Sequence, residues 1–259
     1  MDIKLLSRRR IIAIANQKGG VGKTTTAVNL AASLALANRR VLLIDLDPQA
    51  NTTSFLGIEK STINLSSYEV MVDGCPLLDA RIPTCVESLD LIPSAMRLVG
   101  AEIEMVTMDN RERRLKNALE DPRLAYDFVF VDCPPSLSIL TVNALVASGS
   151  VLVPVQCEYF ALEGLGLLLN TIEKVQQSLN PELAIEGVLL TMFDSRLNLS
   201  RQVEAEARRV FDGKVYQTMI QRNVRLSEAP GFGKPIVLYD PTSAGAENYV
   251  ALAKEVIAS

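Results

Sequence analysis

A glycine-rich stretch at residues 16–26, NQKGGVGKTTT, constrains this chain more than any other part of its sequence. The apolar run before it, residues 11–15, is typical of a buried strand, whereas residues 24–37 have the character of a helix. Between a strand and a helix, glycines let the backbone fold closely around phosphate oxygens with its N–H groups pointing inward. The helix adds the positive end of its dipole. The stretch therefore predicts a P-loop that binds a nucleoside triphosphate.

Two side chains at the end of this loop have distinct predicted roles. The Lys23 amine is expected to reach the β- and γ-phosphates, and the Thr24 hydroxyl is expected to ligate Mg²⁺. Together the loop's amides and side chains give a continuous set of predicted nucleotide-binding residues: Lys18, Gly19, Gly20, Val21, Gly22, Lys23, Thr24 and Thr25.

The composition excludes several other kinds of site. The 259 residues include no histidine, which removes Ser-His-Asp catalysis, histidine general bases and histidine metal ligands. The four cysteines form no C-x-x-C pair, and their spacing fits neither a zinc site nor a disulfide framework. Free thiols in a reducing cytosol are therefore the expected state of Cys75, Cys85, Cys133 and Cys157.

Apolar runs alternate with helical segments along the rest of the chain. Runs that predict further strands are residues 41–49, 89–93, 126–132, 150–155 and 186–194. Helices are predicted at 139–147, 162–177 and 244–257, and a solvated helical face at 100–119. This alternation, with 48% apolar residues, predicts an α/β fold whose mostly parallel, twisted sheet is flanked by helices on both faces. We expect one P-loop NTPase domain over residues 1–259, with residues 1–10 as a basic extension.

Three aspartates lie at the ends of two predicted strands. Asp45 and Asp47 follow the second apolar run, and Asp132 ends the run that begins at Tyr126. Strand ends are where α/β folds place their chemistry, so these carboxylates are expected beside the P-loop. Asp132 is in a Walker B-like position and is predicted to hold Mg²⁺ through water. The prolines after it, in residues 133–136, stiffen a loop that should sense the γ-phosphate.

The P-loop departs from the pattern G-x-x-x-x-G-K-[ST] at its first position, where Gln17 replaces glycine. It has instead a second lysine, Lys18, which makes KGGVGKT a deviant Walker A motif. With this motif, the two aspartates of residues 45–47 and the Walker B-like strand in this order, the chain resembles the ParA/MinD family of P-loop ATPases. Within that family it resembles the chromosome-partition ParA (Soj) branch, over nearly its whole length.

The resemblance implies a role for each motif. Asp47 would lie near the γ-phosphate and orient the attacking water, while Asp45 would support the metal region. Lys18 would reach across a two-fold interface to the ATP of a partner subunit, and Gly19 would permit the close approach. The implied catalytic residues are Lys18, Lys23 and Asp47, and the implied metal-site residues are Thr24, Asp47 and Asp132.

Basic charge is concentrated near the C-terminus. Residues 196–234 contain eight basic and four acidic residues, a net charge of +4 in a chain of formal charge −4. Such a patch on an acidic protein predicts a polyanionic partner. The resemblance implies non-specific contacts to double-stranded DNA by Arg196 and Arg225, within the segment 222–230. Two departures from that branch, Gln221 and the sequence of residues 240–246, predict a weaker or shifted DNA footprint.

The resemblance also implies partners and a location. They are an ATP-dependent homodimer, DNA, and a ParB-like centromere-binding protein that raises a slow intrinsic ATPase rate. The basic start of the chain, Lys4 and Arg8 to Arg10, is a predicted partner contact, with solvated charge as the competing interpretation. Residues 158–164 resemble the family's dimer face, although an ordinary helix start explains them nearly as well. No stretch approaches the ~18 apolar residues of a membrane span, so we expect a cytoplasmic protein without a membrane partner. The resemblance implies that it associates with the nucleoid.

Three alternatives remain at this point. An orphan ParA-like ATPase would have the same biochemistry but position a protein cargo. A MinD-like membrane positioner would need a basic membrane-targeting face, which the last predicted helix lacks. An iron–sulfur ATPase like the nitrogenase iron protein would need two suitably placed cysteines per chain. Only Cys133 stands near the site motifs.

Overall fold

The computed structural model describes residues 9–159 and 165–259. These residues form a seven-stranded sheet in the order β3-β4-β2-β5-β1-β6-β7. All neighbouring strands are parallel except the β3–β4 pair, which is antiparallel. The strands are β1 (Arg10–Ile14), β2 (Val41–Asp45), β3 (Ile82–Pro83), β4 (Leu89–Ile92), β5 (Phe128–Asp132), β6 (Ser150–Gln156) and β7 (Ala184–Thr191). The predicted fold class is confirmed.

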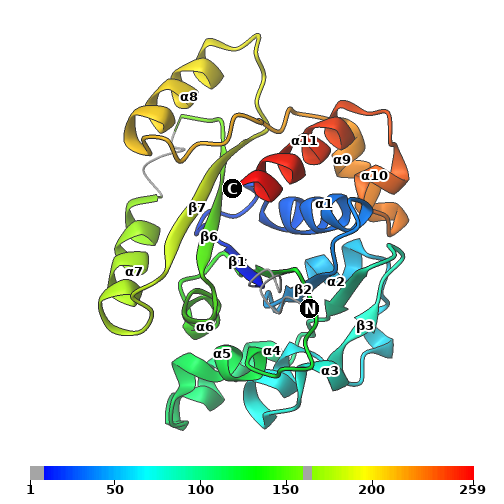
Figure 1. Cartoon of the computed structure of the whole chain (residues 1–259), viewed down its shortest axis with the longest axis vertical. Coiled ribbons are helices and arrows are strands. Elements are labelled where there is room, and N and C mark those ends of the chain that lie inside the picture. Colours follow the sequence, from blue (N-terminus) through cyan, green and yellow to red (C-terminus); the bar gives the residue numbers. More distant parts are fainter. Residues whose placement is uncertain (1–8, 160–164) are drawn as a thin grey trace, which may run out of the picture.

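Helices cover both faces of this sheet (Figure 1). One face packs against α1 (Lys23–Leu36) and α11 (Ala244–Ala258), and the other against a layer that contains α5 (Arg114–Leu119) and α6 (Ile139–Ala147). The remaining helices are α2 (Asn51–Phe55), α3 (Leu77–Ala80), α4 (Leu98–Glu104), α7 (Leu165–Ser178), α8 (Asn198–Val210), α9 (Val224–Glu228) and α10 (Ile236–Tyr239).

The sequence of β5, FVFVD, shows why the sheet is buried on both sides. Phe128 and Phe130 belong to the core under α1 and α11, whereas Val129 and Val131 belong to the core on the other face. Successive side chains of a strand point to opposite faces, so a continuous apolar run fills both cores at once. Asp132 ends this run, and the register pairs it with Ile14 of β1 and Asp45 of β2. The P-loop and the aspartates therefore meet at one edge of the sheet.

Most predicted elements occur within a residue or two of their expected ends, as α1, α6 and α11 show. The helical face predicted over residues 100–119 is confirmed only at its two ends, which are α4 and α5, because 3₁₀ turns at Met105–Thr107 and Arg111–Arg113 lie between them. The chain leaves the helical conformation between α4 and α5, and Asn110 has a φ of 53° there. The short edge strand β3 was not predicted, because a two-residue pairing leaves no periodic pattern. Residues 162–164 of the helix predicted over 162–177 lie outside the described residues. Within the described part of the chain, no helix is both long and apolar enough to span a membrane.

Candidate nucleotide-binding site

The P-loop connects β1 to α1 in a conformation that requires two of its glycines. Gly20 and Gly22 have φ values of 76° and 89°, a region that side chains disfavour. Gly22 is the N-cap of α1, so the first amides of the helix open into the loop. The buried Val21 anchors the loop to β7, because its carbonyl accepts a hydrogen bond from Thr191 Oγ1 at 2.8 Å. The loop thus presents backbone N–H groups around a fixed centre.

Lys23 is the buried cation of this loop, with only 7% of its surface exposed. Its Nζ donates to the backbone oxygen of Lys18 at 3.0 Å, which folds the amine back over the loop. Burial lowers the Lys23 pKa, while the nearby carboxylates of Asp132 and Asp47 act in the opposite direction. A desolvated ammonium beside phosphate-binding amides is suited to a triphosphate.

Asp132 lies at the floor of the site and is completely buried. Its Oδ2 accepts two hydroxyl hydrogen bonds, from Thr24 at 2.8 Å and from Thr52 at 2.7 Å. Its Oδ1 is also buried and has no hydrogen-bond partner among the described residues. Loss of solvation raises the pKa of Asp132 to about 6, although the two hydroxyl bonds oppose that rise.

Those features fit Mg²⁺. The described residues contain no cluster of three or more Asp, Glu, Cys or His side chains that could form a complete metal cage. Magnesium commonly keeps several waters and binds through one or two protein groups plus substrate phosphates. Thr24 and the unsatisfied Oδ1 of Asp132 are suited to that role, Thr24 as a ligand and Asp132 through water.

Asp45 and Asp47 have different environments, although they are two residues apart. Asp45 is fully buried, and its oxygens accept hydrogen bonds from Thr53 and from the Asp47 N–H. Burial, with a contribution from the negative charge of Asp132, raises the pKa of Asp45 to about 8. Asp47 lines the cavity and accepts the Gln49 N–H at 2.9 Å. Asp45 therefore stabilises the loop, and Asp47 is the carboxylate available to a ligand.

Two adjoining cavities surround the loop. One, of about 500 Å³, is lined by Gly19, Lys23, Thr24, Asp47 and Pro135 among others. The other, of about 300 Å³, is lined by Thr25, Thr191, Arg222 and Tyr249 among others. They share four lining residues, which are Gly22, Thr25, Met192 and Pro230. Together they offer space for a phosphate chain and a nucleoside.

Met192 and Arg222 were absent from the predicted set. The strand predicted over residues 186–194 pointed to this end of the site, but no motif marked the individual side chains. Met192 has a φ of 51°, which is uncommon for a residue with a side chain. Backbone strain of this kind is concentrated at functional sites.

Lys18 lies at the rim of the site, with 37% of its side chain exposed. Its backbone N–H donates to Asn16 Oδ1 at 3.0 Å, and its amine forms an ion pair with Glu158. Lys18 must therefore release Glu158 before it can act on the nucleotide of another subunit, a role that stays a prediction. Of the predicted dimer-face segment 158–164, residues 160–164 lie outside the described residues.

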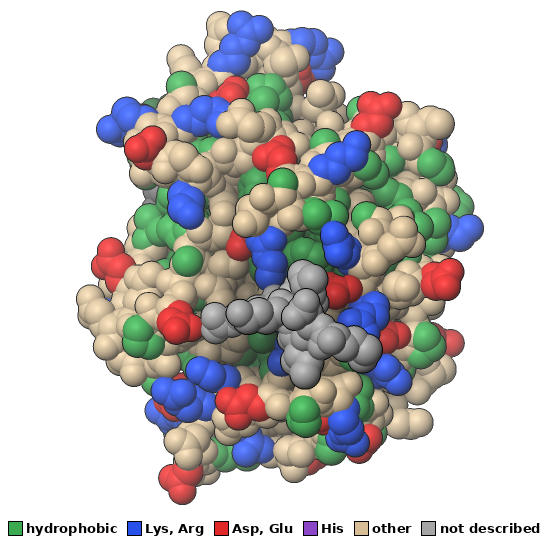
Figure 2. All heavy atoms as spheres, viewed as in Figure 1, with side chains coloured by type: hydrophobic (Ala, Val, Ile, Leu, Met, Phe, Trp, Pro, Cys, Tyr) green, Lys and Arg blue, Asp and Glu red, His purple; other side chains and the backbone are tan. Residues whose placement is uncertain are grey.

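The two predicted DNA-contacting arginines are each paired with carboxylates of the same chain. Arg196 makes two hydrogen bonds to Asp194, at 2.9 and 2.7 Å, and they lower the pKa of Asp194 to about 2. Arg225 pairs with Glu228 at 2.9 Å and with Asp240 at 3.4 Å. Figure 2 shows the same intermixing over α8, where blue side chains alternate with red ones. The positive charge near the C-terminus is therefore partly neutralised in the single chain.

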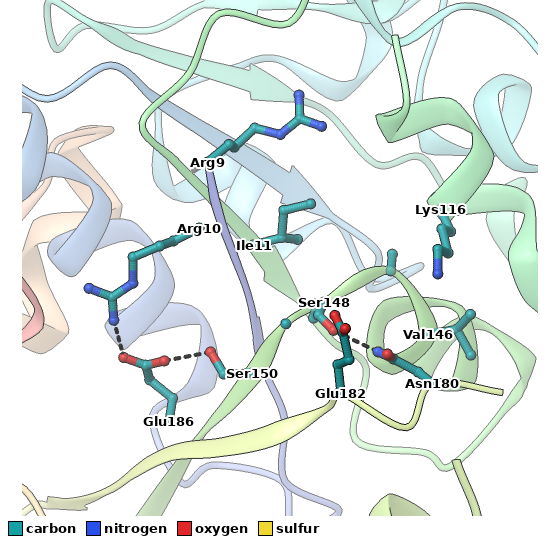
Figure 3. A pocket seen from close by; sticks show the side chains of 12 residues that line it. Arg9, Arg10, Ile11, Lys116, Val146, Ser148, Ser150, Asn180, Glu182 and Glu186 are labelled. Carbon is teal, nitrogen blue, oxygen red and sulfur yellow. Dashed lines mark hydrogen bonds and ion pairs between the residues drawn. The ribbon is translucent and has the colours of Figure 1, made fainter. Parts of the chain in front are cut away.

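A further cavity of about 620 Å³ lies near the start of β1 and is lined by Arg9, Arg10 and Lys116 (Figure 3). Arg10 forms an ion pair with Glu186 and donates to the Val256 carbonyl. Arg9 donates to two backbone carbonyls, those of Leu119 and Leu124. Both guanidinium groups thus bind this chain itself in the single subunit, and their contact with a partner stays a prediction. The other members of that contact, Lys4 and Arg8, lie outside the described residues.

A family model, two curated proteins and a solved structure are similar to this chain over most of its length. A family model described as an AAA domain matches residues 9–185. The chain is 60% identical over 250 residues to the sporulation initiation inhibitor protein Soj of Bacillus subtilis, covering 96% of this chain and 99% of that protein. It is 54% identical over 248 residues to the chromosome partitioning protein ParA of Myxococcus xanthus, covering 96% and 88%. A solved cobyrinic acid a,c-diamide synthase of Mycobacterium smegmatis, with bound ATP analogue and magnesium, is 38% identical with a TM-score of 0.85, covering 96% and 95%.

Proposed function

This chain belongs to the Soj/ParA family of chromosome-partitioning ATPases, and from that premise we propose that ATP joins two copies of it into a dimer that holds DNA. Its ligands are ATP and Mg²⁺. The observation that carries the proposal is the convergence of Lys23, Thr24 and Asp47 around one cavity at the edge of the sheet. The buried Asp132 is hydrogen-bonded to Thr24 beside it. Hydrolysis of ATP then dissociates the dimer, which releases the DNA.

Positioning and electrostatics perform the hydrolysis. Lys23 binds the β- and γ-phosphates, and Asp47 orients the attacking water. When bound, Mg²⁺ neutralises charge that develops on the phosphates. Phosphoryl transfer depends chiefly on such placement, and this site contains no histidine base. A slow intrinsic rate follows, which a ParB-like partner raises.

Charge explains why a second subunit is part of this proposal. Two triphosphates brought face to face repel one another unless cations enter the interface. Each subunit supplies Lys18, whose amine moves from Glu158 to the partner's phosphates. Gly19 suits such an interface, because a Cβ built there meets no atom of the described chain within 4 Å. Bound ATP therefore stabilises a symmetric dimer.

We expect Lys18→Ala to weaken the ATP-bound dimer by at least about 10-fold, since the lysine is lost twice per dimer. ATP affinity of the single subunit should change much less, because Lys23 and the loop amides remain. Sedimentation equilibrium with a non-hydrolysable ATP analogue gives the dimer constant, and titration of a fluorescent analogue gives the affinity.

A second variant at the same interface is Gly19→Ala, because a Cβ at this position meets no atom of the described chain within 4 Å. It should keep the unfolding temperature of the wild type and lose the dimer. A dimer constant that neither Lys18→Ala nor Gly19→Ala alters would remove this loop from the interface.

Dimerisation would bring two sets of basic residues onto one polyanion. When two weak sites are linked, the second contact with DNA becomes intramolecular and the overall affinity rises. Because ATP links the two subunits, DNA affinity becomes ATP-dependent although no additional residue contacts the DNA. Arg196 and Arg225 are well exposed, at 86% and 55% of their side chains. Their carboxylate pairs are of the exposed kind that contributes little free energy, so phosphates can displace them. Contacts of this kind position a protein on DNA without reading its sequence.

Arg225→Glu is expected to reduce DNA affinity by about 10-fold or more and to lower its salt dependence, while the ATP dimer persists. The matched control is Arg123→Glu, because Arg123 is likewise exposed and paired with a neighbouring carboxylate, that of Asp121. DNA retention is measured across a salt titration for both variants, and only Arg225→Glu should differ from the wild type. Equal retention by Arg225→Glu and the wild type would refute the assigned DNA contact.

The cellular setting completes the proposal. We place the protein on the nucleoid in the cytoplasm, where a ParB-like protein bound at a centromere triggers hydrolysis and release. Retention on DNA with ATP, with ADP and without nucleotide, each with and without a candidate ParB, tests this cycle. DNA binding that is equal in all three nucleotide states would contradict it.

Two of the alternatives have specific tests. An orphan positioner of a protein cargo would pull down that cargo rather than a centromere complex. A MinD-like protein would sediment with liposomes when ATP is present. Against the iron–sulfur class, Cys133 is 1% exposed and lies inside its own subunit, which is unsuited to a cluster shared by two subunits.

A further inference from the structure

Helix α2 carries two adjacent threonines, Thr52 and Thr53, whose side chains are completely buried. Neither belongs to the predicted nucleotide- or metal-binding residues. Buried hydroxyl groups need hydrogen-bond partners, and these two donate to different aspartates of the site. Thr52 Oγ1 lies 2.7 Å from Asp132 Oδ2, and Thr53 Oγ1 lies 2.7 Å from Asp45 Oδ2. One short helix is therefore bonded to two carboxylates that end adjacent strands.

The two aspartates differ in how many of their carboxylate oxygens have a hydrogen-bond donor. Both oxygens of Asp45 accept hydrogen bonds from this chain, one from a backbone amide and the other from the amide and hydroxyl of Thr53. Asp132 directs Oδ2 at two hydroxyls, and its buried Oδ1 has no partner in the described residues. A buried carboxylate oxygen without a donor is costly. Among the residues that the structure describes, Asp132 therefore has one carboxylate oxygen that is free to accept a hydrogen bond from a ligand, whereas both oxygens of Asp45 are already bonded.

We propose that Thr52 is a positioning residue for the Mg²⁺ site, because its hydroxyl orients the Asp132 carboxylate and keeps Oδ1 available to the ion's water shell. This inference rests on the assignment of Mg²⁺ to Thr24 and Asp132. A carboxylate can only accept, so the single hydroxyl proton of Thr52 must point at Oδ2. With Thr24 bonded to the same oxygen, the carboxylate is held from two sides. Partners that orient metal-binding groups in this way commonly change metal affinity 10- to 100-fold when lost.

The chain supplies its own matched control. Thr52→Val and Thr53→Val each remove one hydroxyl from the same helix, with the same bond length to a buried aspartate. Of these two threonines, only Thr52 contacts the carboxylate that has an unsatisfied oxygen in the described chain, which is that of Asp132. The measurement is the dissociation constant of a fluorescent ATP analogue for the full chain, taken in saturating Mg²⁺ and again in EDTA. The ratio of the two constants reports the contribution of Mg²⁺ and does not depend on turnover.

We expect Thr52→Val to reduce this ratio by at least about 10-fold, with little change in EDTA. Thr53→Val should lower the unfolding temperature but keep the wild-type ratio, and Thr52→Ser should restore the ratio because it restores the hydroxyl. If Thr52→Val is too unstable, Thr52→Ala gives the same comparison with less crowding. A wild-type ratio in Thr52→Val or Thr52→Ala overturns the inference.

The variant Asp132→Asn separates this inference from its premise. It should lose most of the Mg²⁺ contribution, because the amide cannot replace the carboxylate toward the water shell of the ion. A wild-type ratio in Asp132→Asn would overturn the Mg²⁺ assignment itself. A reduced ratio there together with a wild-type ratio in Thr52→Val would overturn the role of Thr52 alone.

Discussion

Replacing Lys23 by alanine is expected to weaken ATP binding by about 100-fold or more, to the point that no complex forms at micromolar nucleotide. The amine is buried and close to the loop amides, so its contact with the phosphates would be largely desolvated. Losing one partner of such a charged contact costs about 2–5 kcal/mol. Titration of a fluorescent ATP analogue in Mg²⁺ measures the loss.

The unfolding temperature without nucleotide is the control for Lys23→Ala. The amine donates to one backbone oxygen in the described chain, and its burial already lowers its pKa. Removing the cation relieves that desolvation, so the variant should be at least as stable as the wild type. A folded Lys23→Ala protein that binds ATP as tightly as the wild type would refute the P-loop assignment.

Asp47→Ala is expected to reduce the turnover number by about 100-fold or more while ATP still binds. Misplacing an attacking group by about 1 Å can already cost 10²-fold, and here the group that orients the water is removed. Asp47 lines the nucleotide cavity, and within the described residues it is hydrogen-bonded to Asp45 and Gln49 rather than to the P-loop, so affinity should survive. An ATP-bound dimer should therefore accumulate, which light scattering detects.

Asp47→Asn provides a comparison that keeps the size of the side chain and removes its charge. If the negative charge of the carboxylate is what orients the water, the asparagine variant should be slow as well, because its neutral amide oxygen is a weaker acceptor. Turnover at the wild-type rate in Asp47→Ala would exclude Asp47 from the chemistry.

Local patterns in the sequence were sufficient for the framework of this protein. The runs that became β2 and β5 are apolar on both faces and end in aspartates, and parallel strands place such ends together. The P-loop glycines at positions 20 and 22 have the positive φ that a phosphate loop demands. These features depend only on residues that are close together in the sequence, so they can be predicted from a single sequence.

Contacts between distant segments were not predictable in the same way. Gly57 and Gly233 both have positive φ, and a Cβ on Gly233 would lie 2.7 Å from the Gly57 Cα. That backbone contact joins the end of α2 to the segment after Arg225, and no sequence pattern records it. The bond from Thr52 to Asp132 spans 80 positions and is equally hidden. The pairing of Arg225 with Asp240 is of the same kind, because it depends on how α9 lies against the end of α10.

The central claim is that ATP holds two copies of this chain together. Sedimentation velocity of Asp47→Ala tests it most directly, because slow hydrolysis keeps the nucleotide intact during the run. With saturating Mg²⁺-ATP the account predicts a species of twice the monomer mass, and with ADP it predicts the monomer. A monomer in saturating ATP, with binding confirmed in the same sample, would contradict the account.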